Sequence, residues 1–219
     1  MFYFEDFCGK KVLKSDFIQS VQAFFTTRNG FDFELLESKR IITPNQTHSD
    51  NVQIVDSRIN YPETDGLITN RVDETIYLRF ADCTPLIFYD STKNIGAVSH
   101  AGWRGTFQKI GMKTVQKMVS SFSCNPKDII VLIGPTISLC CYEVGSEVKE
   151  KLLSTVKNKE KLFDGNYIDL KAINAEQLKE IGVEKIDICP YCTSCNNDLF
   201  YSYRKENGTK ERHYAVLML

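Results

Sequence analysis

Only three histidines occur in the chain, and two of them, His48 and His100, lie outside any core pattern. His48 lies in a polar stretch, residues 43–50, and His100 closes an apolar run and leads into a glycine-rich segment, residues 101–105. Cys83 closes another apolar run. Functional side chains often occur where strands end in loops, because the strands hold them in place and the loops leave access.

Two imidazoles and one thiolate form a suitable ligand set for zinc, with a fourth position left open for a reactant. The intervals between His48, Cys83 and His100 are too long for a zinc finger and suit a site assembled from three separate loops. Spacing alone also fits a buried thiol and two solvated loop histidines, so both interpretations stay open at this point.

The segment after His100 suggests an anion site. Apolar residues recur at helical spacing from Phe107 to Phe122, which predicts a helix with Thr106 as its N-cap. The free N–H groups of a helix start attract anions, and Arg104 lies beside them. A metal next to such a site predicts an enzyme that acts on, or with, phosphate; the alternative is an ordinary tight turn.

Composition narrows the class of protein. Lysine and arginine total 27 against 28 for aspartate and glutamate, a formal charge of -1, which argues against a nucleic-acid or anionic-membrane partner. No long apolar run and no signal peptide are visible, which predicts a cytoplasmic location. We therefore expect the eight cysteines to be thiols or metal ligands.

The hydrophobic pattern predicts one domain over residues 1–219, of α/β or mixed α+β class. A second helix should begin after Asp169 as its N-cap and run toward Gly182. The predicted strands cover residues 75–80, 85–89, 95–98, 129–133, 200–203 and 214–219.

A second group of cysteines has a C-x2-C-x2-C pattern, formed by Cys189, Cys192 and Cys195. It allows an iron–sulfur or zinc site if Cys140, Cys141 or His213 supplies a fourth ligand, and it also allows a redox pair. Buried thiols beside a strand are the interpretation we prefer, and the role of the three cysteines stays open.

Several motifs together resemble the YfiH-like laccase-domain family. HAGWRG at residues 100–105, with ADC at 81–83 before it, is the most specific combination. The resemblance extends from about Phe25 to Leu219, with further motifs at residues 46–48, 64–69, 133–137, 141–145 and 200–204. The chain departs from the family pattern near its end, where Glu211-Arg212 replaces a Gly-Arg pair.

The resemblance implies mixed β-sheets flanked by helices, as in certain toxin deamidases, and a zinc ion bound by His48, Cys83 and His100. It also implies phosphorolysis of adenosine, inosine and methylthioadenosine, with adenosine deamination as a side activity. Purine nucleosides and phosphate are the expected partners, for a monomer or homodimer. The alternatives are a metal-free hydrolase or deamidase using Cys83 and His100, the polyphenol oxidase (laccase) activity of the family label, or a zinc-stabilised binding module without enzymatic activity.

Chemistry helps to choose among these activities. Three histidines are too few for the copper cluster of a multicopper oxidase, although copper would substitute for zinc where it is abundant. For deamination, Asp82 or Glu143 is the expected acid/base residue. The residues expected to bind substrate or phosphate are Arg28, Gln46, Arg104, Thr106 and Tyr142.

Overall fold

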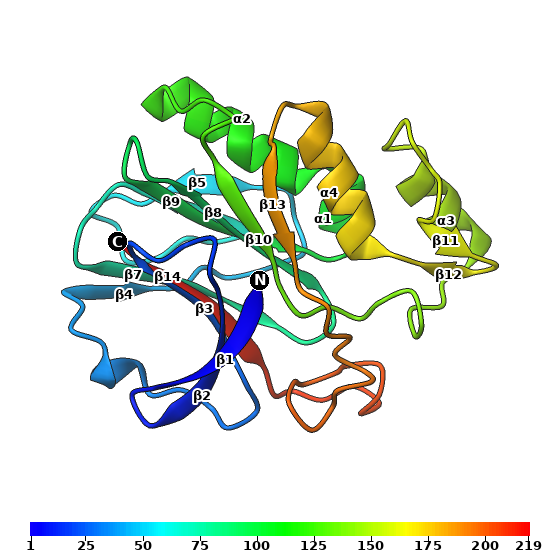
Figure 1. Cartoon of the computed structure of the whole chain (residues 1–219), viewed down its shortest axis with the longest axis horizontal. Helices are drawn as coiled ribbons and strands as arrows, with labels where there is room; N and C mark the ends of the chain where they lie inside the picture. The colour runs from blue at the N-terminus through cyan, green and yellow to red at the C-terminus, as the bar shows by residue number, and fades with distance from the viewer.

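Two six-stranded β-sheets lie face to face, and helices cover the outer face of the second sheet (Figure 1). The computed structural model describes residues 1–219. In spatial order the first sheet consists of β1 (Phe2–Phe7), β2 (Lys10–Ser15), β3 (Gln22–Thr26), β14 (His213–Met218), β7 (Glu74–Phe80) and β4 (Arg40–Ile42). The second consists of β13 (Lys185–Ile188), β10 (Ile130–Ile133), β8 (Thr84–Asp90), β9 (Ile95–Ala101), β6 (Gly66–Thr69) and β5 (Val52–Ile54).

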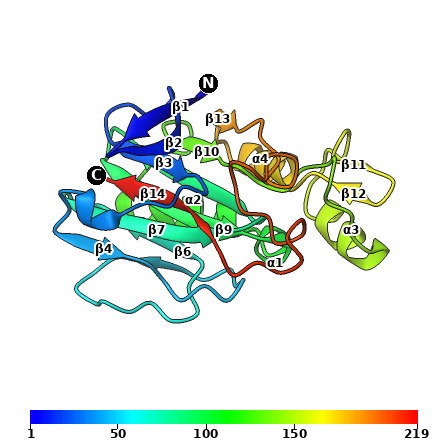
Figure 2. The same cartoon turned by 90° about the horizontal axis from the view of Figure 1, so that it is seen from below.

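The α-helices all lie between residues 103 and 180. They are α1 (Trp103–Phe107), α2 (Ile110–Phe122), α3 (Ser146–Leu153) and α4 (Leu170–Glu180), and a single 3-10 turn, η1, covers Phe33–Leu35. A short hairpin, β11 (Phe163–Asp164) with β12 (Tyr167–Ile168), lies beside α3 at one edge of the molecule, as Figure 2 shows. The mixed α/β class predicted from the sequence is therefore confirmed. No helix has the length and apolar character needed to cross a bilayer.

Strand β8 shows why the second sheet has apolar side chains on both faces. Leu86 and Phe88 pack toward α2 and α4, whereas Ile87 and Tyr89 belong to the core between the two sheets. All seven residues of β8 are buried. A strand covered on both faces appears in a sequence as a continuous apolar run, because alternation arises only where one face meets water.

Most predicted elements are confirmed, including the strands in the middle of the chain and the terminal strand β14. The predicted cap is also confirmed, since the Asp169 side chain accepts a hydrogen bond from the Ala172 N–H at 3.0 Å. The predicted strand at residues 200–203 is wrong. The Glu206 carboxylate accepts from the Ser202 N–H, and this local bond holds the segment in turns instead of a sheet ladder.

The predicted start of the long helix is also wrong. Two helices replace it: α1 begins after Gly102, and α2 begins after Lys109, whose φ of 61° breaks the helical path. Thr106 is not an N-cap, because it lies inside α1, where its hydroxyl donates to the Ala101 carbonyl. Tertiary packing of α1 against the end of β9 decides this start, and helical periodicity carries no information about it.

His213 is an unusual core residue of β14. It is fully buried between Phe80 and Phe200, and neither of its ring nitrogens has a hydrogen-bond partner. Burial, with a smaller contribution from Arg212, lowers the pKa of His213 to about 3. Between about pH 6.5 and pH 3, His213 is therefore protonated in the unfolded chain and neutral in the folded chain.

We expect His213→Phe to flatten the acid side of the stability profile. The folded pKa lies below the unfolded one, so wild-type stability is lost as the pH falls from about 6.5, at up to about 1.4 kcal/mol per pH unit. Urea unfolding of both proteins between pH 4 and 7 measures the difference. Parallel pH profiles for wild type and variant would contradict a neutral, unpartnered His213.

Candidate active site

The segments that connect the two sheets bring together the three predicted metal ligands, His48, Cys83 and His100. Residues 43–51 run from β4 in the first sheet to β5 in the second and carry His48. Residues 81–83 run from β7 to β8, again between the sheets, and carry Cys83. His100 lies near the end of β9, opposite Pro85 of β8, with its ring next to Phe80.

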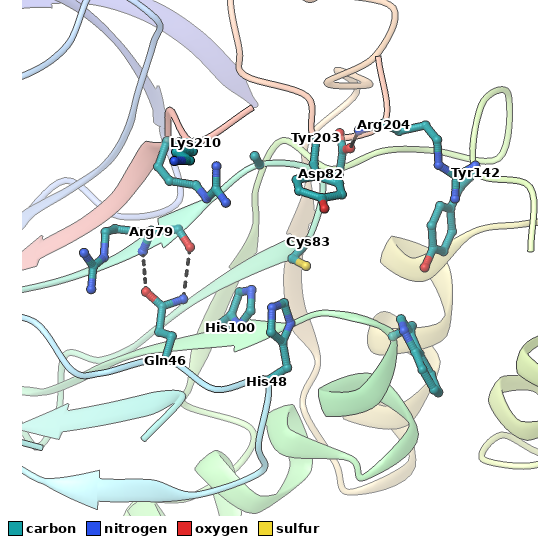
Figure 3. A pocket seen from close by; sticks show the side chains of 13 residues that line it. Gln46, His48, Arg79, Asp82, Cys83, His100, Tyr142, Tyr203, Arg204 and Lys210 are labelled. Atoms are coloured by element: carbon teal, nitrogen blue, oxygen red, sulfur yellow. Dashed lines mark hydrogen bonds between the residues drawn. The ribbon is translucent and has the colours of Figure 1, made fainter. Parts of the chain in front are cut away.

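The ligand atoms of His48, Cys83 and His100 all lie within 4.8 Å of one another. The two imidazole rings have centroids 4.7 Å apart and are inclined at 61°. Figure 3 shows the Cys83 sulfur and both rings directed into the same space. The structure thus brings together three residues from distant parts of the sequence into a group with the donor set of a metal site.

Asp65 is the residue that orders this group. It is fully buried, and its carboxylate lies 2.8 Å from Nδ1 of His100. It also accepts hydrogen bonds from the backbone N–H groups of Thr47, His48 and Ser49 and from the Ser49 hydroxyl, at 2.7–3.1 Å. These bonds hold His48 at a φ of 59°, a conformation that a residue with a Cβ rarely adopts.

The charges of the group support one another. Burial alone would raise the pKa of Cys83, but His100, followed by His48, lowers it to about 6. Burial would lower the pKa of His100, but the Cys83 thiolate and Asp65 raise it to about 9. The pKa of Asp65 likewise falls to about 2 despite burial, through His100 and Ser49. The two histidines therefore favour the thiolate form of Cys83.

Gly102 allows the close approach of the donors. A Cβ atom at this position would lie 2.9 Å from Sγ of Cys83 and 3.1 Å from Nδ1 of His48. Gly102 is the residue before α1, with φ of -65° and ψ of 178°, so it is needed for space and not for an unusual backbone angle. The donors thus form a cradle that a larger residue would fill.

A pocket of about 680 Å³ opens above these donors. Its other lining residues include four cationic side chains and the aromatic rings of Trp103, Tyr142 and Tyr203. The cations are Arg79, Arg204, Lys210 and Arg212. A chain with a net charge of -1 thus concentrates positive charge in the pocket that contains the donor group.

Three of the remaining predicted site residues line this pocket. Tyr142 does so with the guanidinium of Arg204 above its ring, 5.5 Å from the centroid, and burial raises the pKa of its hydroxyl. Gln46 bonds through its amide to the backbone N–H and carbonyl of Arg79, at 2.8 and 3.0 Å (Figure 3). Asp82 accepts from the Thr193 hydroxyl and from the Arg204 N–H, at 2.6 and 2.7 Å.

Four predicted residues lie outside the pocket lining. Arg28 forms an ion pair with Glu206, and Arg104 is exposed with its guanidinium over Trp103. Glu143 is exposed and contributes its backbone carbonyl to Arg204. Thr106 is fully buried with its hydroxyl bonded inside the fold, which corrects the phosphate contact predicted for it.

Sequence reasoning missed Asp65 and all four pocket cations. Asp65 and Arg204 were present in recognised motifs, but nothing in the motifs indicates which side chains converge. Arg79 occupies the polar position of an alternating strand, where the usual expectation is simple solvation. Lys210 and Arg212 lie in the turn before β14, and only the arrangement of the strands shows that this turn faces the pocket.

Comparison with known proteins agrees with the motifs. Residues 22–219 match the family described as Multi-copper polyphenol oxidoreductase laccase. The chain belongs to this family. It is 35% identical over 189 residues to Purine nucleoside phosphorylase YlmD of Bacillus subtilis, covering 78% of this chain and 68% of that protein. It is 38% identical over 183 residues to the Purine nucleoside phosphorylase of Aquifex aeolicus, covering 83% and 84%.

Solved structures of family members confirm the fold. The crystal structure of the Bacillus licheniformis hypothetical protein YfiH superimposes with a TM-score of 0.88 at 28% identity, covering 99% of this chain and 98% of the other. The crystal structure of YlmD from Geobacillus stearothermophilus gives 0.87 at 27% identity, covering 98% of each. The relatives named as phosphorylases indicate that the family contains enzymes.

We expect Asp65→Asn to destabilise the fold by about 2–4 kcal/mol. The amide of asparagine has an NH2 group in place of one carboxylate oxygen, and this group cannot accept hydrogen bonds from the surrounding backbone N–H groups. Each lost bond to a charged acceptor is worth about 1.5–3 kcal/mol, partly recovered by rearrangement. Chemical denaturation at pH 7 measures this loss. The matched control is Asp50→Asn, which removes a partly exposed pair with Lys113 and should change stability by less than about 1 kcal/mol. Equal effects of both changes would contradict the organising role of Asp65.

Proposed function

We propose that the chain is a zinc-dependent purine nucleoside phosphorylase acting on adenosine, inosine and methylthioadenosine. The observation that supports this most strongly is the pocket itself, in which four cations face a thiolate–imidazole donor group. A phosphate ion and a neutral nucleoside are complementary to that arrangement. The relatives named as purine nucleoside phosphorylases support the same reaction class.

The donor set suits zinc. His48, Cys83 and His100 would hold the ion and leave a fourth position facing the pocket, as catalytic zinc sites do. Asp65 orients His100 through Nδ1, so that Nε2 is the ring nitrogen left for the ion. When bound, zinc would supply a Lewis acid that polarises an oxygen of a reactant. Copper would occupy the same ligands where it is abundant.

The cations would hold phosphate and stabilise the charge that develops during the reaction. Arg204 and Lys210 belong to the segment between β13 and β14, whereas Arg79 comes from β7. Phosphate bound between them would attack C1′ of the ribose. As the new C1′–O bond forms, the bond from C1′ to the purine nitrogen breaks and its electron pair passes to the purine, which takes up a proton. The products are ribose 1-phosphate and the free base.

The aromatic side chains Trp103 and Tyr142 would enclose the purine. Because burial raises the pKa of Tyr142, its hydroxyl stays protonated and can donate a hydrogen bond at neutral pH. We propose adenosine deamination as a side activity, in which a water oxygen replaces the 6-amino group and ammonia leaves. Asp82 lines the pocket and Glu143 does not, so Asp82 is the acid/base residue we propose for this reaction.

A metal-free cysteine hydrolase is the second candidate, favoured by one observation. Asp65, His100 and Cys83 form a series in which a buried carboxylate orients an imidazole beside a thiolate, as in cysteine nucleophile sites. The metal requirement separates the two candidates. Full turnover by a zinc-free preparation with all three residues intact would support the hydrolase and contradict the phosphorylase.

We expect ribose 1-phosphate to form from inosine only in the presence of phosphate, and His48→Ala to abolish the reaction. Lys210→Met should raise the KM for phosphate about tenfold, since one charge-assisted contact of about 1.4 kcal/mol is lost. The control is Lys205→Met in the same turn, an exposed cation outside the pocket lining, which should leave that KM unchanged. Release of hypoxanthine at the same rate without phosphate would replace phosphorolysis by hydrolysis.

We also expect Gly102→Ala to weaken metal binding by on the order of 10–100-fold, because its Cβ displaces the Cys83 sulfur. Gly145→Ala is the matched control. Gly145 precedes α3 with a similar φ of -68°, and a Cβ there meets nothing within 4 Å. Zinc affinity is measured by competition with a chromophoric chelator. Unchanged affinity in folded Gly102→Ala protein would contradict the proposed ligand set.

A further inference from the structure

Four cysteine thiols gather outside the pocket lining, on two loops that are far apart in the sequence. The Sγ atoms of Cys140, Cys141, Cys192 and Cys195 all lie within 4.8 Å of one another. Sγ of Cys195 lies 3.5 Å from Sγ of Cys140 and 3.4 Å from Sγ of Cys141. Cys192 is buried, whereas Cys140 and Cys195 are exposed, so the group lies at the surface with one member anchored inside.

The sheet explains why these cysteines meet. Strands β10 and β13 are parallel neighbours with Ile133 opposite Ile188, so their carboxyl ends open at the same edge of the sheet. The loops that follow remain in contact, since the N–H of Thr193 donates to the Thr136 carbonyl at 3.2 Å. The N–H of Ser138 also lies 3.4 Å from Sγ of Cys192. Backbone contacts thus preset the spacing of the thiols.

The remaining member of the C-x2-C-x2-C pattern, Cys189, and the third histidine, His213, are not part of the group. Cys189 is fully buried in the core between the sheets, and His213 lies in the same core beside Phe200. The predicted burial is therefore confirmed for Cys189 and Cys192 and wrong for Cys195, which is exposed. The pair Cys192 and Cys195 finds its partners in the adjacent Cys140 and Cys141.

The distances fit a single tetrahedral ion. With a zinc–sulfur bond of about 2.3 Å, tetrahedral geometry places thiolates about 3.8 Å apart, within the range found here. An iron–sulfur cluster also holds several irons and sulfides between its cysteines and so needs more room. Four thiolates around one divalent ion select zinc over calcium or magnesium, which prefer oxygen.

We propose that Cys140, Cys141, Cys192 and Cys195 bind one structural zinc ion, separate from the ion of the pocket. With four protein ligands the coordination is complete, so this ion has no open position for a reactant. It would join the loop after β10 to the loop after β13, two segments otherwise connected by a few hydrogen bonds.

The two loops also form one wall of the pocket. Tyr142 directly follows Cys141 and lines the pocket, and the hydroxyl of Thr193 donates to Asp82 at 2.6 Å, next to Cys83. An ion that cross-links the two loops would therefore fix the position of this wall relative to His48, Cys83 and His100. The role is one of positioning, because none of the four thiols lines the pocket.

Zinc content of full-length protein, made in zinc-supplemented medium and purified without an affinity tag under reducing conditions, tests the proposal. We expect wild type to hold two equivalents per chain. Cys195→Ser should lose one equivalent and His48→Ala should lose the other, so that the two sites are counted independently. The control, Cys8→Ser, removes an exposed thiol far along the chain from the cluster and should leave both equivalents in place.

Cobalt in place of zinc identifies the ligands. In the His48→Ala background we expect the intense thiolate-to-cobalt absorption of a four-sulfur site, lost in His48→Ala/Cys195→Ser and kept in His48→Ala/Cys8→Ser. Should Cys195→Ser fail to fold, native mass spectrometry of folded His48→Ala protein decides, since a bare chain overturns the proposal. Bound iron, or disulfides among the four cysteines in metal-free folded protein, would also overturn it.

Discussion

The site depends on one buried negative charge. The Asp65 carboxylate has no access to solvent, and a charge in that position persists only where hydrogen bonds replace its hydration. Three successive backbone N–H groups, from Thr47 to Ser49, supply most of that replacement and so determine the path of the loop that carries His48. The remaining capacity of the carboxylate faces His100. One residue thereby sets the position of two donors.

The arrangement of the two sheets makes this possible. Segments that cross from one sheet to the other must leave the ladders, and their backbones then need other partners. Gln46 and Asp82 provide such partners, to Arg79 and Arg204 respectively. Both bonds also hold a cation at the pocket. The polar side chains of these connecting segments thus satisfy backbone groups and, in doing so, position cationic side chains in the pocket next to Cys83.

The family description and the residues of the site lead to different chemistry. A multicopper oxidase requires more imidazoles than the three present here, and one of the three, His213, is confined to the core. The family description indicates the use of a metal. The three-residue donor group and the four pocket cations fit one metal ion beside an anionic reactant better than a copper cluster. Relatives named as phosphorylases agree with the pocket and not with the label of the family.

The sequence by itself determined the strands of the middle of the chain and the Asp169 cap, and its family motifs singled out the three candidate donor residues. Periodicity, capping and residue chemistry depend on neighbours along the chain, so they can be recognised locally. Three features were decided only by the tertiary structure. They are the interruption of the helix at Lys109, the four cationic side chains in the pocket lining, and the meeting of Cys140 and Cys141 with Cys192 and Cys195. The physical reason is that loops meet according to the order of strands in a sheet. That order results from the packing of the whole chain, and no local pattern records that β10 and β13 are neighbours.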